Sequence, residues 1–361
     1  MDLQPLRDAA RADVDNGWLP SCQLAVARDG ELVAFEAFGK ATTDTRFCVF
    51  SVTKPLVASV IWQLLGEGCL QTADPVSDHI PEFAKNGKEA VTVEQVLLHT
   101  SGFPNAPMRP EAGADPVRRR ERLASWYLEW EPGSRFEYHA GSAHWVLAEL
   151  IAGHTGEDFR DAVYERVCRP LGLPRLLGLA EDEQTGIAAL SAVGEAVGRE
   201  DENYLFDYDR PDVVAAGIPG GGAVATAADI ATFYQALMND RLGLWDPAVL
   251  DDATSNVRCV LPDPLLGVPV NRTVGLVVAG DDGQHVRRYA AFGRQCSPRA
   301  FGHAGAHGQV AWADPGTGIS FAYLTNGIDG DWMREGFRSY ILSTLASRLS
   351  DPSRPPSTIP A

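Results

Sequence analysis

The sequence has little positive charge and no long apolar run. Lysine and arginine together number 31, against 48 aspartate and glutamate residues, and there are only 4 lysines. The net charge of −17 favours solubility and repels phosphate backbones, so we exclude nucleic acid as a partner. No stretch approaches the roughly 20 apolar residues that span a bilayer, and the N-terminus lacks the basic and apolar segments of a secretory signal. We therefore expect no membrane partner.

The cysteines and two absent signatures exclude further classes of protein. The six cysteines are scattered along the chain, at Cys22, Cys48, Cys69, Cys168, Cys259 and Cys296. Their spacing matches no metal or redox motif and predicts reduced thiols in a cytoplasmic protein. His-Glu-x-x-His does not occur, and we expect no metal or other cofactor. Gly-x-Ser-x-Gly is also missing, which disfavours an α/β-hydrolase.

Local patterns predict strands near both ends of the chain. Strand-like runs over residues 23–28 and 31–38 are joined by Asp29-Gly30, a strong hairpin signal. Further strands are expected over residues 273–279, 309–313 and 319–325. Helices are expected over residues 4–17, 52–67, 142–153, 227–239 and 331–347.

This order of elements predicts a fold of the α/β class, in its α+β form. Strands from both termini would form one central antiparallel sheet, flanked by the N- and C-terminal helices. We expect a sheet domain over residues 1–78 and 216–350, an inserted helical lobe over 79–215, and a disordered tail over 351–361. At 361 residues the chain is long enough for two lobes, and the cleft between them is the expected site.

Ser51 and Lys54 are the most informative pair in the sequence. Residues three apart on a helix are neighbours, and Pro55 is tolerated only near a helix start, so both belong in its first turn. A lysine can accept a serine proton if burial or a nearby cation lowers its pKa toward neutrality. With 18 serines and 4 lysines, chance would supply about 0.2 such pairs, so the pair needs support from other segments.

Two later segments supply that support. Tyr138 lies in a loop just before a predicted helix, where a phenol could relay a proton to a leaving group. The neighbouring His139 could line the same pocket. Residues 301–308, FGHAGAHG, form a glycine-rich edge that enters a strand, and such an edge lets a substrate approach the backbone closely.

Together these motifs resemble a known superfamily of serine hydrolases. They include FSVTKP at residues 50–55, LLHTSGF at 97–103, PGSRFEY at 132–138 and GGG at 220–222. The chain resembles the β-lactamase and penicillin-binding-protein-like enzymes, specifically the class C β-lactamases, the related D,D-peptidases and, most closely, the family VIII carboxylesterases. The resemblance implies a β-lactamase/transpeptidase-like fold, acylation of Ser51, and general acid and base roles for Lys54 and Tyr138.

The expected substrate contacts follow from the same segments. Backbone N–H groups of Ser51 and Ala306 would form the oxyanion hole, and His303, Gly305 and His139 would bind substrate.

The departures from the family pattern bear on the substrate. Where relatives have Tyr-x-Asn, this chain has Ala140, and where they have Lys-Thr-Gly it has His303-Ala304-Gly305. A substrate carboxylate thus loses a cationic anchor.

We therefore expect hydrolysis of a small-molecule carboxylic ester. Three alternatives stay open: a β-lactamase or D,D-peptidase, an acyltransferase that uses the same acyl-enzyme, and a non-catalytic binding protein of the same fold. The natural acyl group, the alcohol and the oligomeric state are left open by the sequence.

Overall fold

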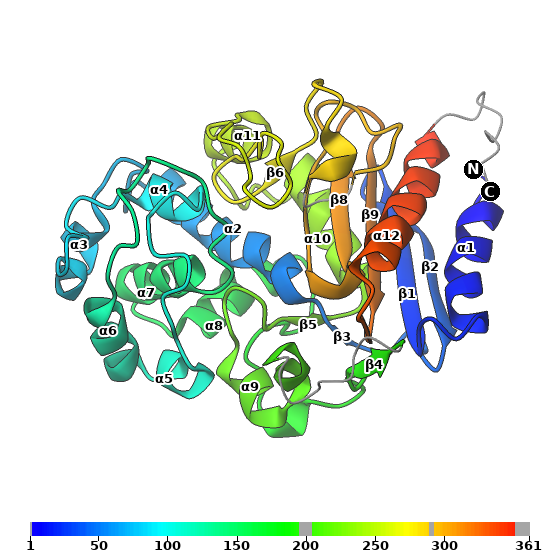
Figure 1. Ribbon diagram of the computed structural model, residues 1–361, viewed down its shortest axis with the longest axis horizontal. Helices are drawn as coiled ribbons and strands as arrows, with labels where there is room; N and C mark the ends of the chain where they lie inside the picture. The colour runs from blue at the N-terminus through cyan, green and yellow to red at the C-terminus, as the bar shows by residue number, and fades with distance from the viewer. Residues whose placement is uncertain (1, 195–203, 289–291, 351–361) are drawn as a thin grey trace.

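A six-stranded antiparallel sheet combines strands from the two ends of the chain, in the order β2-β1-β9-β8-β7-β6 (Figure 1). The computed structural model describes residues 2–194, 204–288 and 292–350, so the predicted tail over 351–361 lies outside the described residues. The strands of this sheet are β1 (Ser21–Arg28), β2 (Glu31–Gly39), β6 (Val277–Val278), β7 (Phe301–Ala304), β8 (Val310–Asp314) and β9 (Ile319–Thr325). Neighbouring β1 and β9 pair N-terminal with C-terminal sequence, which confirms the predicted central sheet.

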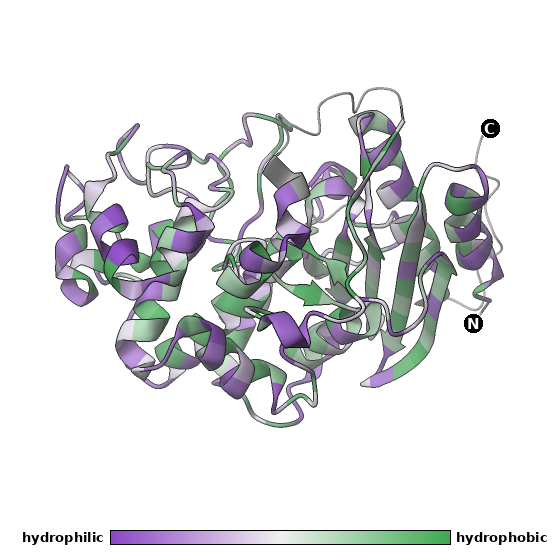
Figure 2. Ribbon diagram, turned by 90° about the horizontal axis from the view of Figure 1, so that it is seen from below, coloured by the Kyte–Doolittle hydropathy of each residue, from purple (hydrophilic) through white to green (hydrophobic). Residues whose placement is uncertain are grey.

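Successive side chains of the central strands point to opposite faces of the sheet, and a hydrophobic core covers each face. On β1, Ala25 and Ala27 belong to the core packed against α10 (Ala227–Asn239), whereas Leu24 and Val26 face the opposite core. That second core includes residues of α1 (Gln4–Asp15) and α12 (Trp332–Ser347), and the two helices pack against each other. Figure 2 shows the hydrophobic residues concentrated in the sheet, with hydrophilic residues on the outer helices. The period-2 pattern thus places helices on both faces.

The middle of the chain is mainly helical and lies beside the sheet in Figure 1. Its longer helices are α6 (Pro116–Ser125) and α7 (Ser142–Thr155), preceded in sequence by α2 (Thr53–Gly66) and followed by α11 (Pro247–Ser255). The shorter helices are α3 (Val76–His79), α4 (Val93–Leu97), α5 (Pro110–Ala114), α8 (Phe159–Val163) and α9 (Pro211–Ala216). The α2 helix packs against α7 and so connects the helical region to the sheet.

Short strands outside the main sheet join distant segments. These are β3 (Phe47–Cys48) with β5 (Val224–Ala225), and β4 (Ser191–Val193) with β10 (Gly327–Asp329). The β3–β5 pair lies directly before the predicted nucleophile. It ties the start of α2 to the chain that follows the glycine run at 220–222.

Several local predictions are confirmed with the expected chemistry. Asp29 and Gly30 both have positive φ, 54° and 90°, and Arg28 pairs with Glu31 across this two-residue hairpin. Thr226 caps α10 through a capping box with Asp229. The predicted strand over residues 273–279 is shorter, however, because Gly275 donates to the Thr273 carbonyl in a tight turn. Within the described residues, no helix is long and apolar enough to cross a bilayer.

Candidate active site

Ser51 sits in a single 3-10 turn, Phe50–Val52, immediately before α2. The turn begins with a strained residue, because Phe50 has a φ of 46°, a left-handed value that non-glycine side chains disfavour. Thr53 holds this backbone in place: its hydroxyl donates to the Phe50 carbonyl at 2.6 Å and accepts from the Ala223 N–H at 3.0 Å. These two hydrogen bonds stabilise the strained backbone, and Ser51 lies at the opening of a cavity.

Lys54 is fully buried beside Ser51 and makes three polar contacts. Its Nζ lies 3.2 Å from Ser51 Oγ, 2.7 Å from the Ala140 carbonyl oxygen and 2.6 Å from the Gly220 carbonyl oxygen. A neutral amine has two N–H groups and one lone pair. The two carbonyls, which can only accept, take the two N–H groups, so the lone pair is left to accept the Ser51 hydroxyl proton.

The surroundings of Lys54 favour this neutral form. Burial, and after it the positive charge of Arg272, lowers the pKa of Lys54 well below its ordinary value. Lysine in water would be protonated and could not act as a base. The shift is in the direction that the sequence-based prediction requires of Lys54.

The glycines at 220–222 leave room for the two carbonyl groups that contact Lys54. A Cβ on Gly220 would lie 3.0 Å from the Ala140 carbonyl oxygen and 3.3 Å from Lys54 Nζ. Gly221 and Gly222 both donate to the Ile218 carbonyl, which turns the chain so that the Gly220 carbonyl faces the amine. The Ala140 and Gly220 carbonyls thus bind the amine. In the Tyr-x-Asn pattern of the β-lactamases that this chain resembles, an asparagine takes the place of Ala140.

Tyr138 lies against the same lysine. Lys54 Nζ is 5.0 Å from the centre of the Tyr138 ring, and the ring stacks on His99 with centroids 4.8 Å apart. His99 accepts the backbone N–H of His139 on Nδ1 at 3.0 Å, so the His99 imidazole fixes the loop that carries Tyr138. Ser51, Lys54 and Tyr138 are therefore brought together from three separate elements.

Ser51 opens onto a cavity of about 310 Å³. Of the predicted site residues, Ser51, Tyr138, Gly305 and Ala306 border it. The remaining lining residues are Phe50, Ala140, Tyr208, Gly220, Gly221 and Ala304. Gly305 has no room for a side chain, because a Cβ there would lie 2.4 Å from the Val49 carbonyl oxygen. The glycine-rich edge thus comes close to the nucleophile, as the sequence predicted.

His303 and His139 are buried and neither borders this cavity. The His303 Nδ1 lies 2.6 Å from the Ala304 carbonyl oxygen, and its Nε2 lies 3.5 Å from an Arg272 nitrogen. His139 donates from Nδ1 to the Glu137 carbonyl and accepts the Phe103 N–H on Nε2. Burial lowers the pKa of His139 to about 4. Both imidazoles hold neighbouring backbone in place, and we no longer assign them direct contact with substrate.

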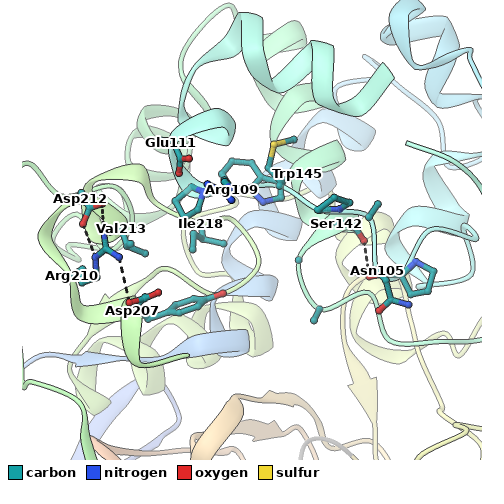
Figure 3. A pocket seen from close by; sticks show the side chains of 18 residues that line it. Asn105, Arg109, Glu111, Ser142, Trp145, Asp207, Arg210, Asp212, Val213 and Ile218 are labelled. Carbon is teal, nitrogen blue, oxygen red and sulfur yellow. Dashed lines mark hydrogen bonds and ion pairs between the residues drawn. The ribbon is translucent and has the colours of Figure 1, made fainter. Parts of the chain in front are cut away.

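A second, larger cavity of about 550 Å³ adjoins the first, and Ala140 and Tyr208 border both. It lies between residues 104–111, the start of α7 and residues 207–218 (Figure 3). Its walls include apolar Met108 and Ile218, and at one side Arg210 pairs with two aspartates.

The sequence reading missed two residues of this region. Tyr208 separates the cavities and packs its ring 5.4 Å from Phe50, and Arg272 lies buried beside Tyr138. Neither belongs to a motif. Among the described residues, no group of three or more His, Cys, Asp or Glu side chains is placed to hold a metal ion.

A serine hydroxyl beside a buried lysine, held between a sheet and a helical region, defines a serine hydrolase of the Ser-x-x-Lys type. The family model described as Beta-lactamase matches residues 6–345, and the chain belongs to this family.

Three relatives support this assignment. Esterase/beta-lactamase LipL of Mycobacterium tuberculosis is 28% identical over 359 residues, covering 90% of this chain and 75% of that protein. Penicillin-binding protein 4 of Amycolatopsis lactamdurans is 26% identical, covering 94% of this chain and 89% of that protein. Among solved structures, a family VIII carboxylesterase matches with a TM-score of 0.78 and 26% identity, covering 96% of this chain and 97% of that one.

Proposed function

We propose that this serine hydrolase cleaves carboxylic esters through an acyl-enzyme on Ser51. The observation that carries the proposal is the lining of the cavity at Ser51, whose described residues include no charged side chain. A β-lactam or a D-alanyl peptide presents a carboxylate, and a carboxylate binds best to a cation. The cavity instead suits a neutral ester. The esterase names of LipL and of the solved carboxylesterase agree with this choice.

The reaction would use the Ser51 hydroxyl and the lone pair of Lys54. The serine oxygen attacks the ester carbonyl while Lys54 takes its proton. Backbone N–H groups of Ser51 and Ala306, both of which border the cavity, would stabilise the oxyanion, an effect of about 2.7–4 kcal/mol per donor in a known serine hydrolase. Tyr138, against the lysine, would pass the proton to the departing alkoxide. Water then releases the acid and restores Ser51.

The larger part of the ester would extend into the second cavity. Ala140 and Tyr208 border both cavities, so a substrate bound at Ser51 can reach the larger one past a methyl group and a ring edge. The lining of the larger cavity combines apolar side chains such as Met108 and Ile218 with charged side chains, so an extended acyl or alcohol group would lie along the apolar part. The charged side chains are those of Arg109, Glu111, Asp207, Arg210 and Asp212.

Replacement of the nucleophile gives the first prediction. Ser51→Ala should lower the specificity constant for a nitrophenyl ester by at least about 10³-fold, because deletion of a serine nucleophile removes the covalent route. It should also abolish the single mass increase that an alkyl fluorophosphonate gives on the intact wild-type protein. Turnover by Ser51→Ala at the wild-type rate would show that the nucleophile is another residue.

The alternatives have distinct outcomes in the same assay. A far higher specificity constant for nitrocefin than for short-chain esters would favour a β-lactamase. Transfer of the acyl group to added alcohols or amines, found by product analysis, would indicate an acyltransferase. A wild-type protein that takes up no phosphonate would be a binding protein of this fold.

A further inference from the structure

Arg272 is a fully buried cation next to the reacting groups. Its guanidinium carbon lies 5.4 Å from the centre of the Tyr138 ring and 5.6 Å from that of Phe136. Its backbone is fixed as in a strand, since its N–H donates to the Cys259 carbonyl and its own carbonyl accepts from the N–H groups of Arg258 and Cys259. The guanidinium therefore has a defined place beside Tyr138, and Arg272 is not among the residues that line the cavity.

Besides Tyr138, six titratable side chains lie near this position. They are Lys54 in α2, His99 after α4, His139 before α7, His144 in α7, Cys259 after α11 and His303 in β7, and all are buried. Burial is the largest cause that shifts the pKa of each: it lowers the pKa of the lysine and the four histidines and raises that of the cysteine. The charge of Arg272 lowers the pKa of all six. Arginine cannot be deprotonated in a protein, so Arg272 is the permanent charge of the group.

Two of the neighbouring histidines, His99 and His303, make hydrogen bonds that fit a neutral imidazole. His303 directs Nδ1 at the Ala304 carbonyl, which can only accept, so its proton is on Nδ1 and its Nε2 lone pair faces Arg272. His99 accepts the backbone N–H of His139 on Nδ1, so Nδ1 of His99 carries no proton. By its resemblance to β-lactamases and D,D-peptidases, this chain has His303-Ala304-Gly305 in place of their Lys-Thr-Gly pattern. The resemblance thus implies an uncharged side chain where that pattern has a cation.

We propose that Arg272 is a positioning residue of the Ser51 site, which supplies from the loop before β6 the positive charge that His303 lacks and so keeps Lys54 in its proton-accepting form. The inference rests on the proposed function, because it needs Lys54 as the base for Ser51. The physical cause is repulsion at low dielectric: a second positive charge close to a fixed guanidinium is costly, and the amine avoids that cost by remaining neutral.

The test compares Arg272→Met with wild type in the rate at which an alkyl fluorophosphonate labels Ser51 between pH 5 and 9. In this reaction the Ser51 Oγ–P bond forms, the P–F bond breaks, and the serine proton leaves with fluoride. We expect the acidic limb of the Arg272→Met profile to move up by about one pH unit, so that labelling at pH 6 is about tenfold slower than in wild type. Arg272→Gln, which keeps a polar side chain without the charge, should move the limb in the same direction.

A matched control separates charge from packing. Arg288→Met removes another buried arginine, one that pairs with Asp282, and it should leave the acidic limb unmoved. If Arg272 served packing alone, Arg272→Met would lower the labelled fraction while its limb stayed at the wild-type pH. That result overturns the proposal. A wild-type protein that takes no label contradicts the proposed function instead, so the two failures are distinguishable.

A direct measurement covers the case in which Arg272→Met does not fold. The chain has only 4 lysines, so NMR spectra of protein labelled with ¹³C at the lysine Cε contain few signals, and Lys54→Met identifies the one from Lys54. We expect the wild-type Lys54 signal at pH 7 to be that of a neutral amine. A charged Lys54 at pH 7 in the folded wild type overturns the proposal.

Discussion

Lys54 shows how burial can set the role of one side chain that makes three polar contacts. A protonated lysine in this position would donate to two carbonyls and to Ser51 Oγ, whereas a neutral one donates to the carbonyls and accepts from the hydroxyl. Burial decides between the two states, because a charged amine without bulk water is costly. Burial, rather than these contacts, therefore favours the neutral form of Lys54.

The buried amine gives a prediction for stability against pH. The pKa of Lys54 is lowered in the folded state and ordinary, about 10.4, in the unfolded state, so between these values the unfolded chain binds the extra proton. The contribution of Lys54 to the free energy of unfolding of the wild type therefore rises as the pH increases toward 10. Lys54→Met cannot titrate, so its free energy of unfolding relative to wild type should fall by at least ~1 kcal/mol from pH 7 to pH 10.

Urea unfolding at pH 7, 8.5 and 10 measures this difference. Lys40→Met removes an exposed lysine and serves as the control, with a difference from wild type that stays constant. A constant difference for Lys54→Met as well would mean that Lys54 is charged in the folded protein.

Among the elements, the end of β7 lies directly against the segment that precedes the nucleophile. The last residue of β7 is followed by Gly305, whose Cα faces the Val49 carbonyl, two residues before Ser51. A sheet edge and a helix start thus meet with no side chain between them. Close backbone contact of this kind needs glycine and keeps the two sides of the cavity at a fixed separation.

Paired glycine substitutions test that contact. In Gly305→Ala the new Cβ would lie 2.4 Å from the Val49 carbonyl oxygen, so we expect a loss of about 1–3 kcal/mol in stability, together with most ester hydrolysis. Gly153→Ala lies on the exposed side of α7, where an added Cβ meets nothing within 4 Å, and should gain about 0.5–1 kcal/mol. Thermal unfolding of both variants measures the effects. If Gly305→Ala is as stable as wild type, the contact is not tight.

At the scale of the whole molecule, the helical region adds a second cavity to the one beside the sheet. The smaller cavity takes residues from the 3-10 turn Phe50–Val52, β7 and the 220–222 turn, whereas the larger one takes residues from 104–111, α7 and 207–218. The chemistry and the space for a large group thus come from different parts of the chain. Such a division leaves substrate size to the helical region.

Filling the larger cavity should change substrate preference. Met108→Trp places a larger side chain in its wall, so we expect the ratio of the specificity constants for a nitrophenyl decanoate and the acetate to fall at least about tenfold. Met333→Trp makes the same replacement at an exposed position of α12 and should leave the ratio unchanged. The acyl-chain-length profile of the three proteins measures this. An unchanged ratio in Met108→Trp would remove the second cavity from substrate binding.

Local signals predicted the elements more fully than the site. The hairpin at Asp29-Gly30 and the start of α10 at Thr226 follow from turn chemistry and capping, and the strand β9 follows from a strand-like run bounded by turn residues. All of these signals act between near neighbours. The strand over 273–279 was overestimated because one glycine turn interrupts an apolar run. His139 and His303 adjoin motif residues in sequence, yet their side chains point into protein, since adjacency along a chain does not give direction.

Sequence alone determined the family-type fold, the Ser51–Lys54 pair and the approach of Tyr138 and Gly305, because motif spacing and residue type carry that information. Tertiary structure alone decided how Lys54 is held and what charge lies near it. The Ala140 and Gly220 carbonyls are 86 and 166 residues from Lys54, and the Arg272 guanidinium comes from a third segment. Backbone carbonyls have no sequence signature, and a lysine pKa depends on burial and on charges that only folding brings together.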